Sequence, residues 1–121
     1  MFTPVDPSAE FDPAQLEHSL DLLGKEAVIE VVRRFEVLAG EFILLSAGGD
    51  PGALVTAAHG IAGCARYIGL CRLGQLCKEA ELAGRKGDHA AMVEAAGQAR
   101  GMLETALATV LSHPGLGPDA P

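Results

Sequence analysis

Apolar residues recur three and four positions apart along most of the chain, a spacing that places side chains on one face of an α-helix. From Lys25 to about Ala47, one such stripe holds Val28, Val31, Phe35, Leu38, Phe42 and Leu45. Four further apolar residues widen it: Ile29, Val32, Ile43 and Leu44. Because one neighbour cannot cover so wide a stripe, either a short preceding helix or a binding partner is expected to pack there. No stretch alternates apolar and polar residues for long enough to predict a β-strand.

Aspartate-proline pairs and glycines mark where the helices begin and end. Asp12 and Asp50 can each cap free backbone N–H groups, and the proline that follows each of them suits a first helical turn. The apolar pattern is interrupted by Gly24, Gly48, Gly49, Gly69 and Gly87. The chain therefore predicts a short helix that ends near residue 24, followed by longer helices over about 25–47, 51–69, 73–86 and 89–113.

The three later long helices each carry a continuous apolar stripe. These stripes hold Leu54, Ala58, Ile61, Ala65 and Ile68, then Leu73, Leu76, Cys77 and Ala80, and finally Met92, Ala96, Ala99, Leu103, Ala106 and Val110. Long helices joined by short connections favour an antiparallel up-and-down four-helix bundle, here with a short additional N-terminal helix. We thus expect an all-α domain over residues 12–112, between proline- and glycine-rich tails at 1–11 and 113–121.

The 121 residues carry a formal net charge of -7, and the nine Lys and Arg residues are scattered along the chain. Nucleic acid and anionic membranes are not expected as partners, because both require clustered positive charge. No apolar run approaches the roughly 20 residues that span a bilayer, and the first residues lack the features of a signal peptide. We therefore expect a cytoplasmic protein.

No metal or cofactor centre is expected. The three cysteines, Cys64, Cys71 and Cys77, form no C-x-x-C pair and leave one thiol over in any pairing, so we interpret them as reduced and mostly packed. No glutamate has a histidine three residues further on, which excludes the Glu-x-x-His motif of di-iron bundles. Glu79 is interpreted as an exposed residue and Glu81 as a structural one, rather than the two as an acid–base pair. Three histidines lack ligand-type partners and are interpreted as ordinary surface residues: His18, His89 and His113.

His59 is the candidate functional residue. At about 100° per residue, it points away from the apolar stripe of its helix and toward solvent. The positions that share its face are Ala62, Gly63 and Arg66, and the next residue is Gly60. These mostly small neighbours leave the imidazole open to a partner.

Gly60 and Gly63 are costly residues in the interior of a helix, because each lowers helix stability by roughly 0.8–1 kcal/mol relative to alanine. The sequence shows no packing reason for either. We interpret them, with Ala62 and Arg66, as a flat partner-binding surface through which the ring is reached. A neutral imidazole nitrogen is a competent nucleophile near neutral pH. The alternative is an ordinary exposed histidine beside small residues.

The segment from Ala58 to Leu70 resembles the signature of histidine-containing phosphotransfer (HPt) domains. The matching positions are His59, Ile61, Gly63, Ala65, Gly69, Leu73, Leu76 and Glu81, and the resemblance extends from about Phe11 to Leu111. It implies that His59 accepts a phosphoryl group and passes it on, in a phosphocarrier that is not an enzyme by itself. The partners implied are a response-regulator receiver domain and a sensor histidine kinase of a bacterial-type two-component phosphorelay. The receiver is expected to supply Mg²⁺, and this chain is expected to bind no cofactor.

Two positions depart from the family pattern. The lysine that is usual three residues after the histidine is Ala62 here, and a common serine is Cys64. Arg66, seven residues after His59, is our candidate for stabilising the phosphoryl group. An equally weighted interpretation of Arg66 is an ordinary solvated arginine. The missing lysine also leaves an alternative function, a degenerate HPt-fold adaptor that binds a receiver or kinase without carrying phosphate.

Overall fold

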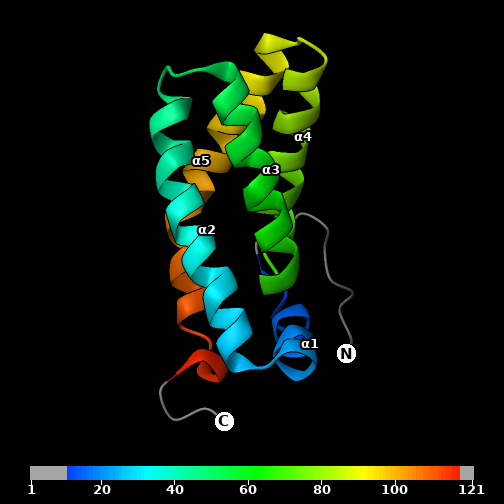
Figure 1. The fold of residues 1–121 in the computed structure, drawn as a ribbon, viewed down its shortest axis with the longest axis vertical. Helices are drawn as coiled ribbons and strands as arrows, with labels where there is room; N and C mark the ends of the chain where they lie inside the picture. Colours follow the sequence, from blue (N-terminus) through cyan, green and yellow to red (C-terminus); the bar gives the residue numbers. More distant parts are fainter. Residues whose placement is uncertain (1–10, 118–121) are drawn as a thin grey trace, which may run out of the picture.

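A computed structural model describes residues 11–117 of the chain (Figure 1). Its elements, in chain order, are α1 (Pro13–Leu23), α2 (Lys25–Ser46), α3 (Pro51–Ile68), α4 (Cys71–Arg85), α5 (His89–Leu111) and the short 3-10 helix η1 (Pro114–Leu116). The described residues contain no β-strand. The prediction of an all-α fold is therefore confirmed.

Most helices begin and end within one residue of the predicted positions, but α4 begins at Cys71, two residues before the predicted start at Leu73, and α5 ends at Leu111 rather than near residue 113. Asp12 and Asp50 each accept a backbone N–H two residues further on, at 3.1 Å, ahead of a proline in the first turn. Gly69 ends α3 with a φ of 80°, a left-handed conformation that costs glycine little. The backbone N–H of Asp12 donates to the Gly69 carbonyl at 2.7 Å, so the start of α1 is tied to the end of α3.

The four long helices lie side by side along the longest axis of the molecule, and the short α1 lies at one end (Figure 1). In that view the chain rises along α2, returns along α3, rises along α4 and returns along α5. The central α3 packs against both α2 and α4, and α5 packs against α4 and α2. Two long neighbours therefore hold the helix that carries His59.

The predicted apolar stripes form the core. Every residue of the stripes predicted for α3, α4 and α5 is buried. On α2, Val31 and Leu45 are only partly buried, whereas Val32 from the wider set joins the core. Ile43 and Leu44 remain exposed, so no described part of the chain covers these two side chains.

The segment after α5 packs against the end of the molecule that holds α1. Leu116 contacts the core, and the Lys25 Nζ donates to the carbonyl of Gly117 at 2.5 Å. The His113 side chain is only 12% exposed, and its ring lies edge-on to that of Phe11. The interpretation of His113 as an ordinary surface residue is therefore wrong, because an aromatic ring and the turn into η1 cover it.

The described part of the chain includes all of the predicted domain, residues 12–112. The predicted N-terminal tail, except Phe11, and residues 118–121 of the predicted C-terminal tail lie outside the described residues. None of the described helices is both long enough and apolar enough to cross a lipid bilayer.

Candidate functional site

His59 lies near the middle of α3, off the buried stripe of that helix. Its side chain is 65% exposed, as the helical spacing predicts. The imidazole is anchored from the neighbouring helix, because its Nδ1 lies 2.9 Å from Oε2 of Glu81 on α4. This contact leaves Nε2, on the far side of the ring, as the nitrogen that a partner can reach.

Glu81 is a buried carboxylate whose side chain is 4% exposed. Besides His59, two cations of its own helix contact it. Arg85 approaches Oε2 with its Nε at 3.0 Å and its Nη2 at 2.9 Å, and the Lys78 Nζ lies 3.4 Å from Oε1. Both carboxylate oxygens therefore have partners, as a buried charge requires.

Burial raises the pKa of Glu81, but the hydrogen bonds from His59 and Arg85 and the charges of His59 and Lys78 outweigh it. The net result is a pKa below the ordinary value of 4.5. The carboxylate is therefore ionised at neutral pH and can only accept hydrogen bonds. When the His59 ring is neutral, its single N–H proton is therefore on Nδ1, which donates it to the Glu81 carboxylate. The lone pair is then on Nε2.

Sequence reasoning missed the pairing of Glu81 with His59. The two residues are 22 positions apart, and only the packing of α4 on α3 brings them together. A signal was present, because Leu73, Cys77 and Glu81 are spaced four apart and the apolar stripe of α4 runs into a carboxylate. A charged residue on a core face indicates a buried and paired group.

The two glycines beside His59 have different surroundings. Gly63 is exposed, and a Cβ there would meet nothing within 4 Å, which is consistent with an open surface. Gly60 is half-buried, and a Cβ there would come within 2.8 Å of Cδ1 of Leu38 on α2. The interpretation that Gly60 has no packing reason is therefore wrong, since its missing side chain lets Leu38 pack against α3 beside the histidine.

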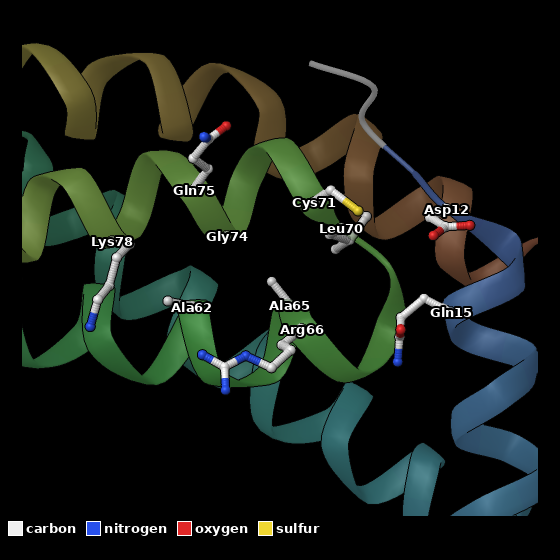
Figure 2. A pocket seen from close by; sticks show the side chains of 10 residues that line it. All are labelled: Asp12, Gln15, Ala62, Ala65, Arg66, Leu70, Cys71, Gly74, Gln75 and Lys78. Atoms are coloured by element: carbon white, nitrogen blue, oxygen red, sulfur yellow. The ribbon is translucent and has the colours of Figure 1, made fainter. Parts of the chain in front are cut away.

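A shallow pocket of about 350 Å³ lies between α3 and α4 (Figure 2). Ala62 and Arg66 line it from α3, and Gly74 and Lys78 line it from α4. In the view of Figure 2, Ala62 lies between the side chains of Lys78 and Arg66. The structure thus brings together Ala62 and Arg66, as expected from the sequence, and adds a second cation from α4.

The three cysteines are free thiols, two of them buried. Burial raises the pKa of Cys77 to about 12, and it raises that of Cys64 against the opposing charge of Arg34. Cys71 is exposed, and partial burial together with the nearby Asp12 raises its pKa as well. The interpretation that the thiols are mostly packed is confirmed, since two of the three are buried. In the described part of the chain, no three His, Cys, Asp or Glu side chains are grouped as they would be around a metal ion.

A comparison with known protein families supports the resemblance noted in the residues around His59. The family model described as Hpt domain matches residues 14–109, which include His59 and Glu81. No curated protein and no solved structure matched the chain. Because the match covers most of the sequence, the chain belongs to the Hpt domain family.

Proposed function

We propose that this chain is a histidine phosphotransfer protein of a bacterial-type two-component phosphorelay. His59 would carry the phosphoryl group between a sensor histidine kinase or receiver domain and a response regulator. Membership of the Hpt domain family supports a role in phosphorelays in general. The observation that carries the specific assignment is the exposed His59 ring held at 2.9 Å by the buried carboxylate of Glu81. We take the fold as an antiparallel up-and-down four-helix bundle, with α1 as the additional N-terminal helix.

In the proposed transfer, the Nε2 lone pair of His59 attacks the phosphorus of a phospho-aspartate on the receiver, and the aspartate oxygen leaves in line. The N–P bond forms as the O–P bond breaks. No proton has to leave Nε2, because the ring proton is on Nδ1. Glu81 stabilises the positive charge that develops on the imidazole, and the same steps in reverse pass the group to another receiver.

The docking surface in this proposal consists of Gly60, Ala62, Gly63 and Arg66. The open space beside Gly63 supports it, and Gly60 contributes mainly by letting α2 pack close to the site. The receiver supplies Mg²⁺, whereas this chain binds no cofactor and is a phosphocarrier rather than an enzyme. We place the protein in the cytoplasm, with neither nucleic acid nor membrane as a partner.

The test is phosphoryl transfer from a receiver domain that carries ³²P on its aspartate. Wild-type protein is expected to gain a label that is lost in acid and kept in alkali, and His59→Gln is expected to gain none. His89→Gln, at an exposed histidine of α5, is the matched control and should label like wild type. Equal labelling of wild type and His59→Gln would sink the proposal.

The alternative is a degenerate HPt-fold adaptor that binds a receiver or kinase and carries no phosphate. Ala62, in place of the usual lysine, favours it. Such an adaptor would bind the receiver equally well after His59→Ala and would form no phosphohistidine. The buried Glu81 favours the phosphocarrier, because a carboxylate held against an exposed imidazole costs desolvation and gives an adaptor no advantage.

A further inference from the structure

We propose that Lys78 of α4 binds the phosphoryl group carried by His59, and so supplies from a second helix the positive charge that α3 lacks at position 62. This inference rests on the proposed function, because it requires a phosphohistidine at position 59. It concerns which cation contacts the transferred group, and it can fail while phosphoryl transfer itself succeeds.

A phosphoryl group brings close to two negative charges at neutral pH and three strong acceptor oxygens. Three cations lie around the site: Arg66, Lys78 and Arg85. Arg85 is engaged through two nitrogens, at 2.9 and 3.0 Å, with the same Glu81 oxygen that contacts His59. Moving Arg85 toward a phosphoryl group would remove a main partner of a buried carboxylate, so we assign it to holding Glu81.

Lys78 is held less tightly than Arg85. Its one described contact, from Nζ to Oε1 of Glu81, is 3.4 Å long, and its side chain is 52% exposed. An ammonium group has three donors, and only one of them is needed for Glu81. Lys78 can therefore keep its contact with Glu81 while it donates to a phosphoryl oxygen on the neighbouring ring.

The packing of α4 on α3 places Lys78 opposite Ala62. At one contact, a Cβ built on Gly74 would lie 3.2 Å from the Cβ of Ala65. At the other contact, Glu81 of α4 lies against His59 of α3. Because the two helices run in opposite directions between these contacts, position 78 on α4 falls level with position 62 on α3 (Figure 2). The alanine ends at Cβ, so it leaves room for the lysine to lie across α3 toward the histidine.

Arg66 lines the same pocket, but it lies further than Lys78 from His59 along the helix axis. It follows His59 by seven residues, which is roughly 10 Å along the helix axis. Lys78 and His59 both contact the carboxylate of Glu81, so only this group separates the lysine from the ring. We assign the direct phosphoryl contact to Lys78, whereas Arg66 lines the pocket further along α3.

The test loads His59 with phosphoramidate, which needs no protein partner and releases ammonia as the Nε2–P bond forms. The ³¹P NMR signal of the phosphohistidine is then titrated with pH. A cation beside the phosphoryl group favours its dianion, so Lys78→Gln should increase the proton affinity of the group about threefold, the effect of one exposed charge pair. Lys78→Arg should preserve the wild-type midpoint, and Lys78→Met should repeat the effect of Lys78→Gln.

The matched control is Lys86→Gln, which removes the same charge from the exposed C-terminal cap of α4 and should leave the midpoint unchanged. Adding Ala62→Lys to Lys78→Gln should restore the wild-type midpoint, because either lysine would fill the same space. A wild-type midpoint in Lys78→Gln would overturn the assignment of Lys78 and leave the carrier role of His59 intact. If phosphoramidate gives no signal that depends on His59, the proposed function and this inference both fall.

Discussion

The Nδ1 atom of His59 and the Oε2 atom of Glu81 lie 2.9 Å apart, so a 65% exposed imidazole is joined to a carboxylate that is 4% exposed. A buried carboxylate must keep its hydrogen bonds, because an unpaired charge away from water costs several kcal/mol, on the order of 3–5 when one partner of a buried pair is removed. The contact therefore determines both which ring nitrogen carries the proton and which one faces the solvent.

Replacing Glu81 is expected to change the tautomer of His59. In the wild type, ¹⁵N NMR in the pH range where the ring is neutral should show the proton mainly on Nδ1. Glu81→Ala removes the acceptor, so the two tautomers should mix and transfer to Nε2 should slow. Glu79→Ala, at an exposed glutamate of the same helix, is the control. A wild-type ring that carries its proton mainly on Nε2 would contradict the tautomer that we derive.

The stability that Glu81 contributes is expected to depend on pH. Its pKa is lowered by folding, so the contribution is present above the ordinary value of 4.5 and is lost as the pH falls through the lower, folded-state pKa. At pH 7, Glu81→Gln should lower the free energy of unfolding by about 1.5–3 kcal/mol, the size of one hydrogen bond to a charged group. Urea unfolding of both proteins should show this difference shrinking below about pH 4.5, and a difference that stays constant in acid would be the wrong outcome.

Alanine at the two glycines beside His59 is expected to have unequal effects on stability. Gly63→Ala meets nothing within 4 Å and should raise the free energy of unfolding by roughly 0.8–1 kcal/mol through helix propensity. Gly60→Ala gains the same propensity but pushes against Leu38, so its net effect should be smaller or negative. Denaturant titrations measure both changes. Equal stabilisation by the two substitutions would mean that Leu38 moves aside at no cost.

The cysteines are expected to react at very different rates with a thiol reagent. Cys71 is exposed, whereas Cys64 and Cys77 are buried, and burial raises the pKa of Cys77 to about 12. Since the thiolate is the reactive form, one thiol per chain should react rapidly near pH 8 and the other two only after unfolding. Mass spectrometry of the labelled peptides identifies the site. Rapid labelling of Cys77 in the folded protein would show that α4 does not pack as described.

Most of the fold could be predicted from the sequence, because the information is local. Helix-capping residues such as Asp50 and end signals such as Gly69 act within one turn, and the apolar spacing of α3 to α5 repeats without interruption. The segment after α5 was harder to predict. Its contacts with α1 and with Phe11 depend on how the ends of distant helices meet, which no short pattern encodes.

The site could be predicted only in part. Helical spacing alone shows that His59 is exposed and that Ala62, Gly63 and Arg66 share its face. The contributions of Glu81 and Lys78 depend on the register of α4 against α3, which is set by contacts such as that of Gly74 with Ala65. The resemblance to the family includes Glu81, and its place at the end of the apolar stripe of α4 indicates a buried, paired carboxylate, but no sequence pattern indicates that its partner is His59 or that Lys78 lies beside them.

Whether His59 carries a phosphoryl group is tested most directly by ³¹P NMR of the phosphoramidate-treated protein, before and after a receiver domain and Mg²⁺ are added. We expect one phosphohistidine signal from Nε2 of His59, absent from His59→Gln, that disappears as the receiver aspartate gains the phosphoryl group. A signal that persists in His59→Gln, or one that never passes to any receiver tested, would contradict the assignment of this chain as a phosphorelay carrier.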